Sequence, residues 1–190
     1  MNNLGVEKPK MKQSNLAVKD MAFIALFTAV IVITSQISIP MPGSVPITMQ
    51  TFAIILTGIV LGPKNGTLSV LVFLLLGAVG LPVFAGFTGG ISKFVGPTGG
   101  FLFSFPLMAL VIGLFAKIKT HKLIWIAIGI ILGTLINFAM GAALFMALTN
   151  SNLWATLTAT IIPFIPGTII KCVAAESVGV LLKKRLQSIL

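Results

Sequence analysis

Lys171 lies inside a long apolar segment near the end of the sequence, where a charged side chain is unusual. A lysine at the centre of a membrane helix costs about 2.5–3.5 kcal/mol on insertion scales, and such residues usually mark functional sites. It precedes Lys183 by twelve residues, which places it roughly 18 Å from the basic cluster that ends the segment. Thr168 lies three residues earlier and shares its face of the helix. The pair predicts a cavity that suits an anion such as a carboxylate.

The segment before Lys171 contains a helix break, Pro163–Gly167. Proline interrupts a helix from within, so we expect a new helix to begin near Gly167 and to offer free N–H groups to an anion. The alternative for Lys171 is an ion pair with Glu176. Five helical residues separate the two side chains by about 140° around the axis, which makes that pairing unfavourable.

Gly80–Gly100 is a long irregular stretch between two apolar segments, with seven glycines, two prolines and a lone lysine, Lys93. In a membrane protein, irregular backbone survives only where it is buried in protein or lines a cavity. The stretch is therefore either a lid over a binding site or a flexible outer loop. Lys93 is accordingly either a second ligand contact or a solvated side chain, and Val83 and Phe84 are expected to form apolar wall.

Gln50 and Asn137 are amides within apolar segments. Each can hydrogen-bond a neighbouring helix, which is the commoner case, or a ligand. Both are therefore candidate ligand contacts.

The composition predicts an integral membrane protein. Of the 190 residues, 57% are hydrophobic and 8% are charged, and the mean hydropathy is +1.11, whereas a soluble domain carries about 25% charged residues. The net charge of +10 comes largely from lysines at the ends of apolar segments. This is the cytoplasmic signature of membrane proteins and gives no reason to expect nucleic-acid binding.

The apolar segments predict an all-α fold with six transmembrane helices and cytoplasmic N- and C-termini. Eleven of the thirteen basic residues fall at inner positions in this assignment, as the positive-inside rule requires. Residues 1–20 are expected to be a cytoplasmic leader and residues 21–190 a single substrate-binding domain. The expected spans are 21–39, 47–61, 67–81, 101–116, 123–148 and 153–182, the last interrupted by two prolines.

The first span carries small residues that could let another helix approach closely. Ala25 and Ala29 form a small-xxx-small pair, and Ala22 lies one turn before them. They are either a docking face for a partner or ordinary alanines of a membrane helix.

The sequence lacks the residue sets of an enzyme. It contains no phosphate-binding loop, so ATP hydrolysis is expected only in partner subunits. One cysteine, one histidine and three acids offer no metal site and no pair of catalytic carboxylates. We therefore expect neither a metal nor a cofactor.

Four motifs together resemble the BioY family, the biotin-specific substrate-capture subunits (S components) of energy-coupling factor (ECF) transporters. The resemblance covers nearly the whole chain beyond the leader. The motifs are Pro46-Ile-Thr-Met-Gln-Thr51, Leu74-Leu-Leu-Gly-Ala-Val-Gly-Leu-Pro-Val-Phe-Ala-Gly86, Gly96-Pro-Thr-Gly-Gly100, and Pro163-Phe-Ile-Pro-Gly167 with Lys171.

The resemblance implies a six-helix fold in the plasma membrane of a prokaryote, which binds biotin from outside. It implies a transmembrane coupling subunit, docked on the alanines of the first helix, and two cytosolic ATPase subunits. The family usually has an acidic residue after Pro-Gly in the last helix. Thr168 stands in that place here and can accept a hydrogen bond but carries no charge.

Two other functions fit the residues alone. A self-sufficient secondary carrier or facilitator for biotin, or for another small carboxylated vitamin, would move substrate in liposomes without partners. A membrane scaffold that used only the alanine face would bind no small molecule.

Overall fold

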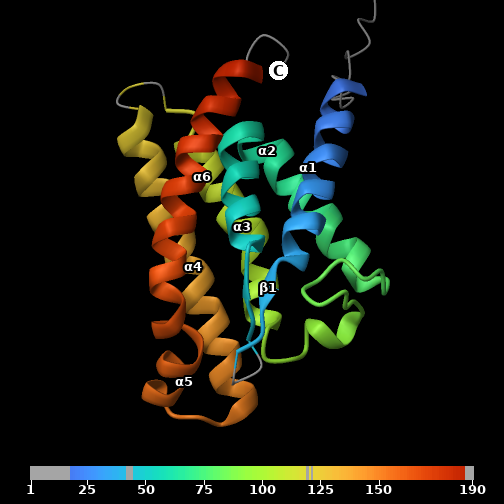
Figure 1. The fold of residues 1–190 in the computed structure, drawn as a ribbon, viewed down its shortest axis with the longest axis vertical. Coiled ribbons are helices and arrows are strands. Elements are labelled where there is room, and N and C mark those ends of the chain that lie inside the picture. The colour runs from blue at the N-terminus through green and yellow to red at the C-terminus, as the bar shows by residue number, and fades with distance from the viewer. Residues whose placement is uncertain (1–17, 42–44, 119, 121, 187–190) are drawn as a thin grey trace, which may run out of the picture.

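The structure is a computed structural model that describes residues 18–41, 45–118, 120 and 122–186. In this part of the chain, helices dominate and a short two-stranded hairpin joins the first two of them (Figure 1). The elements are α1 (Val18–Gln36), β1 (Ser38–Ile39), β2 (Ile47–Thr48), α2 (Gln50–Ala78), η1 (Ile91–Lys93), α3 (Gly99–Phe115), α4 (Lys122–Thr149), α5 (Leu153–Thr160), η2 (Ile162–Phe164) and α6 (Ile165–Leu186).

Four helical segments of the described chain are long and apolar enough to cross a membrane. They are α1, α2, α4 and the run Leu153–Leu186, which comprises α5, η2 and α6; α3 is a shorter apolar helix. These segments agree with the prediction of an all-α membrane protein.

α2 changes direction at Gly62, whose backbone angles of φ 74° and ψ −173° are not helical. Figure 1 shows the first half of α2 rising toward the end of the molecule where the C-terminus lies, and the second half turning back. Such angles are essentially restricted to glycine, and Pro63 is suited to the first turn of the helix that follows. A Cβ at Gly113 of α3 would collide with the backbone of Pro63, so α3 packs directly on the bend.

Three of the differences between the observed and the expected element boundaries exceed a shift of one or two residues at a helix end or change the kind of element. α1 begins at Val18, inside the expected leader 1–20, whose residues 1–17 lie outside the described part of the chain. Residues 38–39 and 47–48, expected at the ends of two spans, form the antiparallel hairpin instead. The break expected between the spans 47–61 and 67–81 is only the bend at Gly62, because the helix resumes at once.

The helices pack around one apolar core, to which α1, α2, α3, α4 and α6 all contribute. Buried members include Ile31, Ile55, Phe73, Met108, Ile126 and Ala175. α3 lies between α2 and α4, and α6 packs on α2. The core therefore joins the first and last helices around the same centre.

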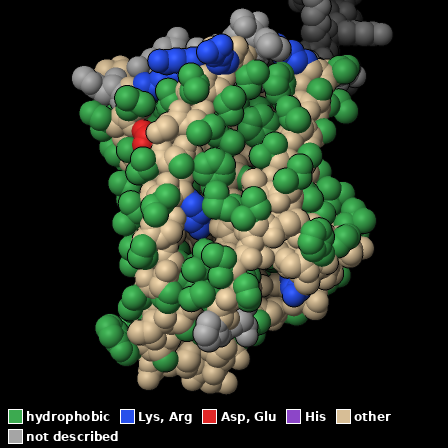
Figure 2. All heavy atoms as spheres, in the orientation of Figure 1, with side chains coloured by type: hydrophobic (Ala, Val, Ile, Leu, Met, Phe, Trp, Pro, Cys, Tyr) green, Lys and Arg blue, Asp and Glu red, His purple; other side chains and the backbone are tan. Residues whose placement is uncertain are grey.

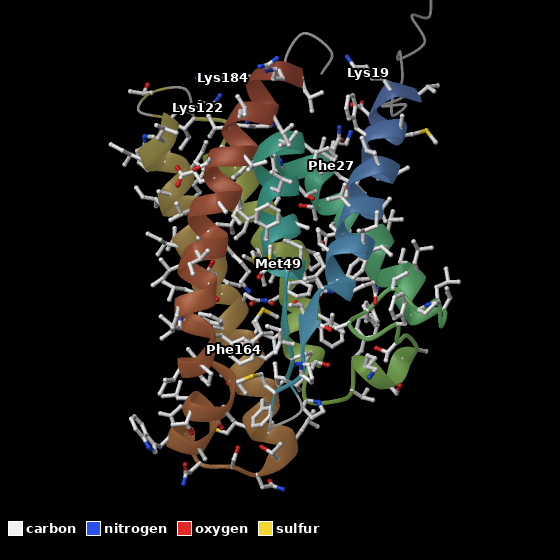
Figure 3. The ribbon with its side chains drawn as sticks, viewed as in Figure 1. Lys19, Phe27, Met49, Lys122, Phe164 and Lys184 are labelled. Carbon is white, nitrogen blue, oxygen red and sulfur yellow. The ribbon has the colours of Figure 1, made fainter. Side chains whose placement is uncertain are left out.

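Most of the Lys and Arg side chains visible in Figure 2 gather at one end of the molecule. Figure 3 shows Lys19, Lys122 and Lys184 at this end, on α1, α4 and α6. We call it the basic end. The Gly80–Gly100 stretch and α5 lie away from it (Figure 1).

Candidate functional site

A cavity of about 500 Å³ lies where the start of α2, the Gly80–Gly100 stretch, α3, α4 and α6 meet. Its volume is typical of a small-molecule site. Six of the seven predicted ligand contacts line it: Gln50, Phe84, Lys93, Asn137, Thr168 and Lys171. Phe164 also lines the cavity, and Figure 3 shows this residue nearer the end opposite Lys184, with Met49 in the middle of the molecule.

Lys171 is the buried cation of this cavity, with only 7% of its surface exposed. Its Nζ donates a hydrogen bond of 3.1 Å to the carbonyl oxygen of Thr48. The recorded partner is thus a backbone oxygen and not the carboxylate of Glu176. An ammonium has three donors, so two remain after this bond. The cavity therefore has a positive group that can receive an anion.

The β1–β2 hairpin positions the oxygen that holds Lys171. Ser38 pairs with Thr48, and Ile39 pairs with Ile47. The Met49 N–H then donates to the Ile37 carbonyl. These bonds fix the chain just before α2 begins. Thr48 also lines the cavity, and its place in the Pro46–Thr51 motif was its only signal in the sequence.

Thr168 lies in the first turn of α6, one turn before Lys171, and both side chains line the cavity. α6 begins at Ile165, two residues before the expected start at Gly167. The break before it is present, because α5 ends at Thr160 and η2 contains Pro163. The proline-rich break therefore brings Thr168 and Lys171 to the cavity at the beginning of a fresh helix.

Gln50 and Thr51 line the cavity, and each has a buried polar atom without a partner within the described protein. Gln50 Nε2 and Thr51 Oγ1 are both buried and make no hydrogen bond. A buried polar atom left without a partner costs about 1–3 kcal/mol. A polar ligand in the cavity would supply the missing bonds.

Asn137 has its partners within the protein. Its Nδ2 donates to Ser104 Oγ at 2.6 Å and to the Phe101 carbonyl at 3.3 Å. These bonds join α4 to α3. Of the two roles expected for Asn137, its nitrogen therefore has the bond to a neighbouring helix. Because Asn137 also lines the cavity, it shapes the wall while its amide nitrogen is already engaged.

Phe84 belongs to the Gly80–Gly100 stretch and forms part of the apolar wall of the cavity. Its ring packs edge-on against Phe73 at 5.4 Å and against Phe94 at 5.7 Å between ring centroids. A Cβ at Gly77 would collide with this ring, so the absence of a side chain there makes room for Phe84. Phe101, further along the chain, also lines the cavity, and its position was not predicted as a contact.

Val83 does not line the cavity, although its side chain is buried. Its carbonyl accepts a bond of 3.1 Å from Gln36 Nε2, while Gln36 Oε1 accepts the Phe87 N–H at 2.9 Å. Gln36, at the end of α1, thus fastens the stretch on both sides of Phe84. Sequence reasoning missed it because the bonds span 47 and 51 residues.

Lys93 ends the short helix η1 and is half-buried on the cavity wall. The Gly80–Gly100 stretch therefore contributes both an aromatic ring and a second lysine to the same space. Together with Lys171, this gives two cations near aromatic and hydroxyl groups. Such a lining suits a small, largely apolar molecule that carries a negative group.

The alanines of α1 lie away from the cavity. Ala22, Ala25 and Ala29 are all exposed on the surface of the helix. Among the described residues, no group of three or more His, Cys, Asp or Glu side chains could hold a metal ion.

Residues 8–188 match the family model described as the BioY family. A relative described as the biotin transporter BioY of Thermotoga maritima is 43% identical over 159 residues, which cover 84% of this chain and 92% of the relative. A biotin transporter BioY of Rhodobacter capsulatus is 39% identical over 174 residues and covers 85% of this chain and 91% of its own.

The fold is also similar to a solved structure. A crystal structure at 2.1 Å, described as the S-component for biotin from an ECF-type ABC transporter, superimposes with a TM-score of 0.82 at 33% sequence identity. The match covers 88% of this chain and 92% of that one.

Proposed function

Because this chain belongs to the BioY family and is the S component for biotin of an ECF-type ABC transporter, we propose that its cavity holds one biotin molecule with the carboxylate on Lys171. The protein is a multi-pass membrane transporter subunit and not an enzyme. The observation that carries the proposal is the buried ammonium of Lys171 on the wall of a largely apolar cavity of about 500 Å³.

Biotin matches this lining because it is apolar in the middle and polar at both ends. The carboxylate takes the free donors of Lys171, and Lys93 adds a second positive charge. The ureido group bonds to Gln50 and Thr51, whose buried Nε2 and Oγ1 atoms lack partners in the protein. Phe84 and Thr168 complete the wall of the cavity.

The membrane arrangement follows from the charges and from the bend in α2. Counting the two halves of α2 separately, with α5–α6 as one span, gives six crossings of residues 21–190. The basic end then lies in the cytoplasm with both termini, and the Gly80–Gly100 stretch lies outside. Biotin thus enters from outside, beneath this stretch.

The partners are a transmembrane coupling subunit and two cytosolic ATPase subunits. The exposed face of Ala22, Ala25 and Ala29 supports close approach of another helix, because small residues let two backbones pack together. ATP hydrolysis in the partners then drives uptake of the vitamin that this chain has captured.

Purification and transport measurements test this function. Mass spectrometry of the detergent-purified chain should detect biotin as the ligand that co-purifies, and biotin added to ligand-free protein should bind at one site. Another vitamin in that place would contradict the assignment. Liposomes containing this chain alone should accumulate little biotin until coupling and ATPase subunits and ATP are added. Full accumulation by the chain alone would favour a self-sufficient carrier.

A further inference from the structure

A second hollow, of about 400 Å³, lies between α4 and α6. We call it the α4–α6 groove. Thr168 and Phe138 line both this groove and the biotin cavity, but its other residues are separate from the cavity. Its walls are mainly apolar, with Ala127, Ile131 and Leu135 on α4 and Ile169 and Val173 on α6.

The groove faces outward, toward the bilayer. Ile131, Leu135, Ile169 and Val173 are each more than half exposed. On α4 the lining runs from Ala127 to Phe138, which is about 16 Å of helix. One leaflet of the bilayer core is about 15 Å deep. The groove therefore has the length and polarity for one acyl chain of a lipid.

Three lysines lie near one another at the basic end, toward which both helices of the groove run. Lys122 begins α4, and Lys183 lies in the last turn of α6. Lys183 Nζ donates to the Ala116 carbonyl at 2.9 Å, which brings it to the end of α3, beside Lys117. The positive charges of Lys117 and Lys122 both act on Lys183. Like charges brought together in this way favour an anion between them.

Both helices of the groove lead to these lysines. On α4, Lys122 lies five residues before Ala127, which is about 8 Å nearer the basic end but about 140° around the axis, so its long side chain reaches the groove around the start of the helix. On α6, Lys183 lies seven residues after Glu176, which is two turns or about 10 Å along the same face. Glu176 lines the groove at this end, so its carboxylate repels a phosphate that is placed deeper than the lysines. The acid therefore helps to keep an anionic head group at the level of the membrane surface.

We propose that the α4–α6 groove binds one anionic phospholipid, with the phosphate on Lys117, Lys122 and Lys183 and one acyl chain along the apolar wall. The positive charge of the three lysines selects the head group, because anionic lipids are attracted to basic residues at the cytoplasmic surface. The apolar wall makes it a lipid site and not a site for a soluble phosphate.

The preference of the full-length chain for one lipid over another tests whether the lysines select an anionic head group. The probes are dioleoyl phosphatidylglycerol and dioleoyl phosphatidylcholine, added to protein in an uncharged detergent and counted by native mass spectrometry. The wild type should retain one phosphatidylglycerol with at least a tenfold preference over phosphatidylcholine. Equal retention of the two lipids would overturn the proposal without the need for any variant.

A charge-matched pair of variants locates the site. Lys117→Gln with Lys122→Gln should reduce the preference at least fivefold, whereas Lys19→Gln with Lys64→Gln should leave it unchanged. The control pair lies beside α1, because Asn65 bonds Asp20 there. Lys183 is left in place because of its bond to Ala116. If both pairs lost the preference for phosphatidylglycerol equally, only the overall surface charge would be acting, and the proposed lipid site would be excluded.

A second matched pair tests the groove itself. Ala127→Phe fills the groove and should reduce retention of phosphatidylglycerol at least fivefold, while Ala139→Phe on another, exposed part of α4 should not. Unchanged retention of phosphatidylglycerol by Ala127→Phe would show that the acyl chain does not bind in the groove. Displacement of phosphatidylglycerol by glycerol phosphate at the same concentration would show the same. Either result would exclude the lipid site. Wild-type affinity for biotin in each variant shows that the fold is intact.

Discussion

Gln50 and Asn137 are both buried amides that line the cavity, but their hydrogen bonds give them different roles. Asn137 donates to Ser104 and to the Phe101 carbonyl, so its nitrogen serves the packing of α3 against α4. Gln50 Nε2 has no partner within the described protein. A lost bond within the protein lowers stability, whereas a lost bond to a ligand lowers affinity.

Gln50→Leu should therefore weaken biotin binding about tenfold, because one hydrogen bond contributes about 1–1.5 kcal/mol. The thermal stability of the ligand-free protein should stay the same. Asn137→Leu is the contrasting variant and should lower stability by about 1–3 kcal/mol, because it removes the two buried bonds, to Ser104 and to the Phe101 carbonyl, that join α4 to α3. Thermal unfolding and biotin titration of both proteins measure this. Wild-type affinity in Gln50→Leu would exclude Gln50 as a ligand contact.

Residue types alone indicated which side chains could meet a ligand, but not what else they touch. Lys171 stood out because a charge within an apolar segment requires a reason. Its partner, the Thr48 carbonyl, is 123 residues away and no local pattern connects the two. The same holds for Gln36, whose bonds to the Gly80–Gly100 stretch depend on how the helices pack. Val83 and Phe84 are adjacent, yet only Phe84 reaches the cavity.

At the scale of elements, the bend at Gly62 makes two helices of what would otherwise be one. Local sequence predicted a break here, since Gly-Pro disfavours a continuous helix. It could not predict that the turn is a single residue, because that depends on the packing of Gly113 against Pro63. The hairpin between α1 and α2 was likewise missed, because its strands contain only two residues each.

Gly62→Ala should lower stability by about 1–3 kcal/mol, because an alanine is strained at a φ of 74°. A Cβ there would meet only the Lys117 Cε at ordinary contact distance, so the cost comes from the backbone. Gly167→Ala is a suitable control, since its surroundings are open and its backbone is helical. Thermal unfolding in detergent compares the two. Equal stability of the two variants would show that the bend does not depend on glycine.

At the scale of the whole molecule, most of the visible basic side chains gather at one end (Figure 2). The Gly80–Gly100 stretch, which helps to line the cavity, lies away from that end (Figure 1). In the proposed function, biotin is captured outside and is released inside with the help of the partner subunits. The proposed orientation can be tested in intact cells with a Cys172→Ser protein that carries one new cysteine. A membrane-impermeant thiol reagent should label Ser92→Cys from outside and should leave Thr120→Cys unlabelled. The reverse pattern would invert the topology.

The alanine face of α1 should matter for assembly and not for ligand binding. Ala25 is exposed on α1 and does not line the cavity. Ala25→Leu should therefore reduce co-purification of the coupling subunit at least tenfold, because a larger side chain holds the partner helix away. Its biotin affinity should equal that of the wild type. Ala139→Leu on α4 is the matched control, and an equal loss of the coupling subunit in both would exclude a specific docking face.

The contact between the biotin carboxylate and Lys171 is the central claim, and a two-by-two titration tests it most directly. Calorimetry would compare biotin with biotinamide, its uncharged analogue, on the wild type and on Lys171→Ala, with Lys184→Ala as a control for charge. We predict that Lys171→Ala weakens biotin binding at least tenfold without unfolding the protein, while biotinamide binds both proteins alike. A Lys171→Ala protein that binds biotin as tightly as the wild type would contradict the account.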